Sequence, residues 1–304
     1  MVPPWLALAA AFAAAALPAG SERAGPEAGA ARAWSLRATA LYRLARDEPG
    51  PRTEALFREA LVAADRAVEL APQLPDGWLV HAELAQAIRY DWLGAWADYE
   101  RARALGADEA ALLPRWGTYL AALGRTEEAV AVLERAASLD PLSADVATDL
   151  AVAYLQQGDL VGARAASERA LRLSSSDPRA TRTLGLALLL DGRFAGARAA
   201  FHRSANAFHA LMGDAMVEHA LGHPAASWRA IERMFAWPDV ENGAWQLARV
   251  FAWRGEPDRA FEWLKTAFHL HDPGLAELKG DPVMRPLASD PRFAALLRDL
   301  NLPE

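Results

Sequence analysis

A glycine recurs in this chain at a nearly constant interval. Gly124, Gly158 and Gly192 follow one another at intervals of 34 residues, and Gly222 and Gly255 come 30 and 33 residues further on. Small residues keep a fixed distance from each glycine, seven places before it and five places after it: Gly117, Ala151, Gly185, Ala215 and Ala248 before, and Ala129, Ala163, Ala197, Ser227 and Ala260 after. Self-similarity at such a period is the sequence signature of a repeat protein, and it constrains the fold strongly.

Each repeat has the pattern of two antiparallel helices joined at the glycine. Apolar residues recur at spacings of three and four, which gives each helix one apolar face. The glycine ends the first helix in a left-handed conformation that other residues adopt only at a cost. Asp140-Pro141 and Asp177-Pro178 end the second helix, because proline biases the residue before it away from helix. One hairpin cannot bury its own apolar face, so the hairpins are predicted to stack into a solenoid.

This pattern resembles the tetratricopeptide repeat family. The resemblance depends on the 34-residue period, the small residues around the turn, Tyr154 before one turn, and the Leu-Asp-Pro sequence at 139–141. Trp34 and Trp78 stand where earlier units would open. The resemblance implies an all-α fold, a right-handed α-α superhelix (solenoid) of about six or seven antiparallel helical hairpins with a C-terminal capping helix. It also implies binding of other proteins along the inner surface of the array.

The repeat register divides the chain into three parts. Residues 1–24 form a hydrophobic N-terminal segment, residues 25–274 the solenoid, and residues 275–304 a capping segment. The units are expected at about 31–74, 75–109, 110–143, 144–177, 178–211, 212–240 and 241–274.

The C-terminal end carries the pattern of a short amphipathic helix. Asp290 can cap it and Pro291 suits its first position, so we expect this helix to cover the last repeat. The stretch from 251 to 297 is also similar to the ends of repeat arrays attached to bacterial signalling proteins, among them winged-helix regulators, nucleotide cyclases and kinases. That resemblance implies a sensory or docking module.

The N-terminal segment predicts export. Thirteen consecutive apolar residues, Trp5–Leu17, precede Pro18, Ala19 and Gly20, which suits the core and cleavage region of a secretory signal. The run is short for a membrane span, which needs roughly 20 residues, and no Lys or Arg comes before Arg23. The alternatives are a cleaved signal peptide, a membrane anchor and a buried soluble helix. The first two place the repeats outside the cytoplasm, in the periplasm or anchored to the membrane.

Composition and motifs argue against several functions. The net charge is −7, from 32 basic against 39 acidic residues, and no basic block stands out, so the electrostatic footprint of nucleic-acid binding is missing. The sequence has no cysteine, which excludes disulfides and thiolate metal sites. It also has no GxSxG, phosphate-binding glycine loop or HExxH motif. We therefore expect no catalytic residues, no cofactor and no nucleic-acid partner.

Histidines are the one candidate for metal chemistry. His219 and His223 are four residues apart beside Glu218, a spacing that can bind zinc if a third ligand converges. Gly222 and Pro224 flank His223, so the helix is expected to end before it and the pair need not share a face. We therefore predict ordinary hydrogen-bonded histidines and no metal site; a metal-dependent hydrolase is the alternative.

Carrying helix positions from unit to unit places one set of side chains on the concave surface. The partner-binding residues predicted in this way are Arg182, Leu186, Met212, Met216, Trp245, Arg249 and Trp253. Apolar side chains beside two arginines suit a peptide with apolar anchors and an acidic group. On this interpretation, Arg182→Ala or Trp245→Ala weakens partner binding and leaves the array folded. The alternative is that the C-terminal tail folds back over this apolar strip.

The sequence thus predicts a non-catalytic scaffold that binds a partner protein or peptide along the concave face. Membrane contact is expected only through the N-terminal segment, if it stays uncleaved. The alternative function is an extracytoplasmic sensory module that binds a ligand for a bacterial signalling system. Repeat arrays share a scaffold but not a task, so the residues do not name the partner.

Overall fold

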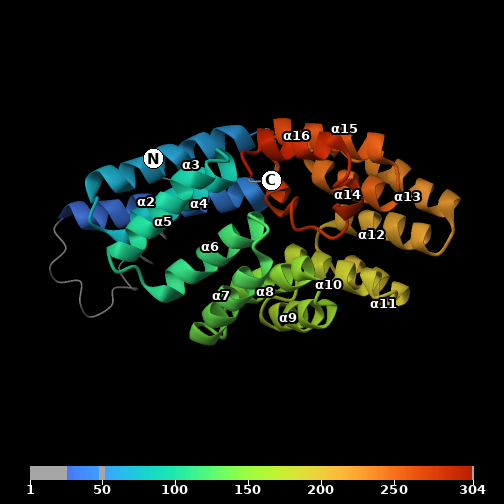
Figure 1. The fold of residues 1–304 in the computed structure, drawn as a ribbon, viewed down its shortest axis with the longest axis horizontal. Coiled ribbons are helices and arrows are strands. Elements are labelled where there is room, and N and C mark those ends of the chain that lie inside the picture. The colour runs from blue at the N-terminus through green and yellow to red at the C-terminus, as the bar shows by residue number, and fades with distance from the viewer. Residues whose placement is uncertain (1–25, 48–51, 303–304) are drawn as a thin grey trace, which may run out of the picture. The chain divides into compact units, whose positions relative to one another are not determined.

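The structure is a computed structural model that describes residues 26–47 and 52–302. The signal or anchor predicted at 1–24 lies outside these residues. Within them all regular structure is helical and there is no strand, which confirms the predicted all-α fold. None of the helices in this part of the chain combines the length and apolar character that crossing a membrane requires. Figure 1 shows consecutive helices folding back on one another as antiparallel hairpins.

The chain divides into two compact units, one within residues 1–112 and one within residues 113–304. The first unit contains two hairpins, formed by α2 (Pro26–Asp47), α3 (Thr53–Leu70), α4 (Pro75–Ile88) and α5 (Trp92–Ala104). Helix α6 (Glu109–Ala122) starts at the end of the first unit and continues into the second. The second unit then contains α7 (Thr126–Leu139), α8 (Ala144–Gln157), α9 (Leu160–Leu173), α10 (Pro178–Leu190), α11 (Phe194–His202), α12 (Ala207–Ala220), α13 (Pro224–Phe235), α14 (Ala244–Trp253) and α15 (Pro257–His269).

The five recurring glycines follow the first helices of the five hairpins from α6 onward, as predicted. All five have a left-handed backbone, with φ between 71° and 91°. Gly158, for example, caps α8 and donates its N–H to the Tyr154 carbonyl at 3.0 Å. Asp159 follows directly and caps α9 by accepting from the Gly162 N–H at 2.9 Å. Turn and next helix are therefore specified together by a few neighbouring residues.

The small residues mark close contacts between the two helices of a hairpin. A Cβ atom added to Gly185 on α10 would lie 2.7 Å from the Phe201 ring on α11. One added to Gly117 on α6 would lie 2.5 Å from Leu133 Cγ on α7. These distances are shorter than carbon atoms tolerate, so a larger residue would force the helices apart. Trp34 and Trp116 pack against buried apolar clusters of their own units.

Two hairpins begin earlier than the expected register, and the first of them starts with α2 at Pro26 instead of 31. The sixth hairpin begins at Ala207, ahead of the boundary predicted at 212, because α11 is short and ends at His202. Asn206 caps α12 by accepting from the Phe208 N–H at 2.9 Å. The boundary at 212 follows from extending the 34-residue period, which ignores local capping residues. An Asn directly before an apolar run favours a helix start at that point, whatever the period.

The chain beyond α15 forms short helical turns and one last helix. These elements are η3 (Pro273–Glu277), η4 (Arg285–Leu287) and α16 (Pro291–Asp299). Asp290 caps α16 by accepting from the Arg292 N–H at 2.9 Å, as predicted. Arg292 also lies over the Phe261 ring at 4.3 Å and pairs with Asp258 at 2.9 Å, both on α15. Helix α16 therefore covers the last repeat.

Candidate partner-binding groove

The first helices of successive hairpins in the second unit form one continuous face. Helices α8, α10, α12 and α14 contact one another in that order along the unit. Sequence positions carried from hairpin to hairpin therefore do meet on one face, as the repeat register predicts. We call this face the groove; the residues that define it below are Gln156, Arg182, Leu186, Met212, Met216, Trp245 and Arg249.

The side chains predicted to bind a partner are buried in this structure. Leu186, Met212, Met216 and Trp245 are 0% exposed, and Arg249 is 2% exposed. The guanidinium of Arg249 lies over the Trp245 ring at 4.8 Å. A fully buried tryptophan is part of the core, so its replacement by alanine should cost about 3–5 kcal/mol. Trp245→Ala is therefore expected to destabilise the array, and whether the array stays folded remains a prediction.

Two further predicted residues are less completely buried. Arg182 on α10 is 6% exposed. Trp253, at the end of α14, is partly exposed, and its indole N–H donates to the Met216 carbonyl at 3.0 Å. Partner binding by these residues stays a prediction, because in this structure their neighbours belong to the same chain.

The chain's own C-terminal part covers the groove. We call residues 272–287 the covering segment; its side chains Leu275, Leu278 and Met284 are 0% exposed. Its Gly274 passes so close to the groove that an added Cβ atom would lie 2.3 Å from Trp245 Cδ1. At its far end Arg285 donates to the Gln156 carbonyl on α8 at 2.8 Å. The structure thus shows the alternative in which the C-terminal tail folds back over the apolar strip.

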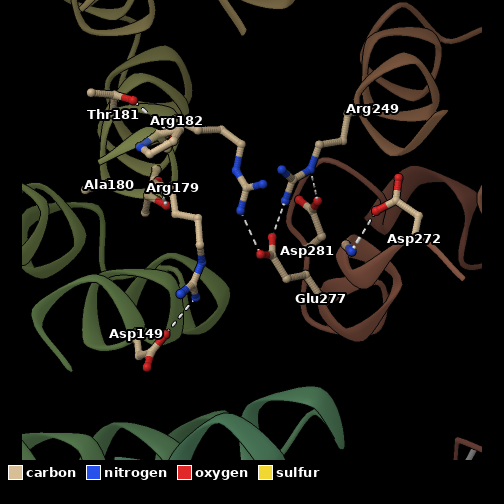
Figure 2. A network of polar contacts seen from close by, with 12 residues as sticks. Asp149, Arg179, Ala180, Thr181, Arg182, Arg249, Asp272, Glu277 and Asp281 are labelled. Atoms are coloured by element: carbon tan, nitrogen blue, oxygen red, sulfur yellow. Dashed lines mark hydrogen bonds and ion pairs between the residues drawn. The ribbon is translucent and has the colours of Figure 1, made fainter. Parts of the chain in front are cut away.

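Ion pairs join the covering segment to the groove. Arg182 donates to Glu277 at 2.7 Å, Arg249 donates to Glu277 at 2.7 Å, and Arg249 also donates to Asp281 at 2.5 Å. Figure 2 shows the two guanidinium groups, from different helices, converging on these two carboxylates. Arg179, one turn before Arg182, pairs instead with Asp149 on α8 at 2.7 Å. The groove therefore supplies two cations whose carboxylate partners come from the covering segment.

Two carboxylates of the covering segment, Glu277 and Asp272, have pKa values shifted in opposite directions. Burial alone would raise the pKa of Glu277, but Arg182 and Arg249 outweigh it and hold that pKa at about 2. Burial raises the pKa of Asp272 to about 6, although its hydrogen bonds from the Gly274 and Trp245 N–H groups act in the opposite direction. Glu277 is therefore ionised at neutral pH, while Asp272 titrates just below it.

A small cavity lies where the groove and the covering segment meet. It measures about 10 Å³, room for about one water molecule, and Gln156, Arg182, Arg249 and Asp281 are among its lining residues. Arg182 Nε, Arg249 Nη1 and Gln156 Oε1 are buried and have no hydrogen-bond partner among the described residues. The covering segment thus leaves part of the groove's hydrogen-bonding capacity unused.

Of the two histidines, His223 has a hydrogen-bond partner at the end of the preceding helix. Helix α12 ends at Ala220, as expected, and His223 precedes α13. His223 Nδ1 lies 2.8 Å from the Glu218 carboxylate, which also pairs with Arg198. Within residues 26–47 and 52–302, no group of three or more His, Cys, Asp or Glu residues is placed to hold a metal ion.

Sequence reasoning missed the acidic half of this site. Glu277 and Asp281 stand in a stretch read as a cap, and their spacing of four residues resembles any exposed acidic pair. The available signal was charge complementarity, since two arginines on an apolar strip require carboxylates if they are buried. Which carboxylates meet them depends on the path of the chain.

The fold and the site define a helical-repeat array that holds a segment of chain in its groove. The tetratricopeptide repeat family model matches residues 115–178 and 162–210. No curated protein sequence matches the chain significantly.

Several solved structures share the fold at low sequence identity. PilW, a type IV pilus biogenesis factor, has a TM-score of 0.54 at 20% identity, covering 67% of this chain and 96% of its own. A tetratricopeptide repeat protein from Parabacteroides merdae has a TM-score of 0.54 at 15% identity, covering 88% and 99%. A monomeric mutant of IFIT1 with Gppp-AAAA has a TM-score of 0.58 at 13% identity, covering 92% and 67%. At such identities the likeness concerns the fold alone.

Proposed function

We propose that this chain is a non-catalytic scaffold that binds another protein or a peptide through its helical repeats. The observation that supports this most directly is the groove of the second unit, which holds a chain segment through Arg182, Arg249 and apolar side chains. A groove that accommodates one such segment has the chemistry to recognise another. Similarity to tetratricopeptide repeat proteins supports the same function class.

The groove indicates the chemistry of the partner. Arginine presents a planar fork of N–H donors that matches a carboxylate, and these charge-assisted hydrogen bonds are among the stronger ones in proteins. Buried leucine and methionine side chains beside Arg182 and Arg249 provide apolar contacts. A partner segment with acidic and apolar side chains fits both features. A polyanion such as nucleic acid would instead be repelled by the protein's net charge of −7.

The proposed site of action is outside the cytoplasm, in the periplasm or at the membrane surface. The support for this is the apolar run Trp5–Leu17 at the N-terminus. Cell fractionation with a C-terminal tag tests it directly: the tagged chain should appear in the periplasmic or membrane fraction. Recovery in the cytoplasm would contradict the proposed location.

Site-specific photo-crosslinking tests the scaffold function. A photoreactive amino acid is placed singly at large, exposed apolar positions, Leu93 on α5, Leu142 before α8 and Val161 on α9, which are 85%, 77% and 67% exposed. A further position, Gln156, reports on the groove. We expect one or more discrete adducts with the same partner protein at a subset of positions. Absence of any specific adduct at all four positions in cells would refute the scaffold function.

A further inference from the structure

The polar links from the covering segment to the groove come from the segment's side chains. At its start the Asp272 N–H donates to the Ala267 carbonyl on α15 at 2.9 Å. Beyond that residue its backbone hydrogen bonds run within the segment, such as Leu278 N–H to the Leu275 carbonyl at 3.1 Å and Met284 N–H to the Asp281 carbonyl at 3.0 Å. The link to α8 at its far end is the Arg285 side chain. A segment held in this way can leave the groove while its own turns keep their backbone hydrogen bonds.

We propose that the covering segment is an internal ligand that keeps the groove closed, and that a partner segment of the same pattern binds by displacing it. The pattern is two acidic residues four places apart, as in Glu277 and Asp281, with leucine beside the first, as in Leu275 and Leu278. This inference rests on the proposed scaffold function. It names the ligand class of the groove and the step that controls access to it.

The charges of the groove favour exchange over a permanent cover. If the cover were permanent, apolar residues in place of the buried ion pairs would make it at least as stable. The free energy cost of removing the charges from water offsets most of the gain from pairing them. When the groove opens, the charged side chains are hydrated again, which lowers the cost of opening. Exposing an apolar strip to water brings no such gain. Once the covering segment leaves, Arg182 and Arg249 lose Glu277 and Asp281, and the groove becomes a positively charged site for carboxylates.

The covering segment satisfies the groove incompletely. Arg182 Nε, Arg249 Nη1 and Gln156 Oε1 lie buried without a hydrogen-bond partner among the described residues. Their side chains line the small cavity between the segment and the groove. A partner that places one additional acceptor near the two arginines gains hydrogen bonds that the covering segment does not make. Such a ligand can therefore compete with a tethered segment despite the tether.

A labelled-peptide exchange experiment tests the proposal on the full chain. The probe is a fluorescein-labelled peptide with the sequence of residues 272–288, and the control probe carries Glu277→Gln and Asp281→Asn. A protease site is inserted between Leu270 and His271, where Leu270 is 41% exposed. Before cleavage the tethered segment competes at an effective concentration on the order of millimolar. After cleavage and dilution the probe should bind at least about tenfold more tightly, and the control probe should not.

A disulfide lock provides the matched closed state. The natural chain has no cysteine, so Gln156→Cys with Gly280→Cys introduces the only pair. A Cβ atom on Gly280 would lie 2.9 Å from Gln156 Cγ, which places the two cysteines within reach of each other. The lock is built in the chain with the protease site. After cleavage, oxidation should abolish probe binding and reduction should restore it.

The outcomes separate this inference from the proposed function. Probe binding to the cleaved, reduced chain but not to the oxidised chain supports displacement. Equal binding to both, no binding to either, or unfolding of the chain after cleavage overturns it, since the segment is then a permanent part of the fold. Crosslinks at Leu93 or Val161 in that case would leave the scaffold function standing, with the partner on another surface.

Discussion

The ion-pair cluster leads to a quantitative prediction for Arg249→Met. Arg249 is 2% exposed and lies 2.5 Å from Asp281 and 2.7 Å from Glu277. Methionine fills much of the same volume but removes both ion pairs. Asp281 is itself 1% exposed, and its carboxylate keeps the hydrogen bond from the Val283 N–H but loses its guanidinium partner. Removing one partner of a buried pair typically costs about 3–5 kcal/mol, because the remaining charge stays buried.

Thermal and urea unfolding of the full chain measure this effect. For a unit of this size, each kcal/mol lowers the Tm by about 2–4 °C, so the second unit should melt roughly 10 °C lower. Circular dichroism and tryptophan fluorescence should be recorded together, since two units need not unfold in one step. The control is Arg229→Met on the exposed face of α13, which should change stability by less than about 0.5 kcal/mol.

A second substitution decides whether the charge is the cause. Asp281→Asn keeps an oxygen that can accept from the Val283 N–H but removes the negative charge. Added to Arg249→Met, it should recover part of the loss, with a coupling energy of about 0.5–3 kcal/mol between the two positions. A cost below about 1 kcal/mol for Arg249→Met, or strictly additive effects, would refute the reasoning from buried charge.

Four further predictions concern stability and pH. Trp245→Ala should lower the free energy of unfolding by about 3–5 kcal/mol in urea, because the side chain is 0% exposed. Wild type should lose stability relative to Asp272→Asn as the pH rises from about 4 to about 6, since the folded-state pKa is raised to about 6. Conversely, wild type should lose stability relative to Glu277→Gln as the pH falls from about 4.5 toward about 2, since that pKa is lowered; urea midpoints across these ranges measure both. In the first unit, a hydrogen bond to Asp98 raises the pKa of His81 above 6.5 despite burial. Protonated His81 should therefore stabilise wild type, and this stabilisation should disappear as the pH rises through and above 6.5. The variant His81→Gln should show no such loss. A flat difference between wild type and variant in any of these pH series would contradict the assigned pKa direction.

The covering segment changes what the groove contributes to the protein. With the segment in place, Leu186, Met212 and Met216 are core residues and stabilise the second unit. With the segment displaced, the same residues would be a ligand-binding surface. Stability and binding therefore depend on the same contacts, and a substitution in the groove should affect both. The covering segment offers cleaner substitutions, because Glu277 and Asp281 belong to the internal ligand and not to the array.

The sequence by itself determined the hairpins. A left-handed glycine, a cap such as Asp159 and a small residue such as Gly185 act on neighbours within one or two helices. These interactions are short in sequence, so their spacing can be read without knowing where the rest of the chain goes. The same reasoning placed α16 over the last repeat and aligned Arg182 with Arg249 on one face.

Only the tertiary structure decided what lies on that face. Arg182 and Glu277 are 95 residues apart in the chain, and no periodic pattern connects them. Trp245 has the same pattern position whether a partner, solvent or the covering segment lies against it, but its burial differs in each case. Repeat periodicity specifies contacts between adjacent hairpins, whereas a non-repeating tail meets the array wherever its charges and apolar side chains are best matched.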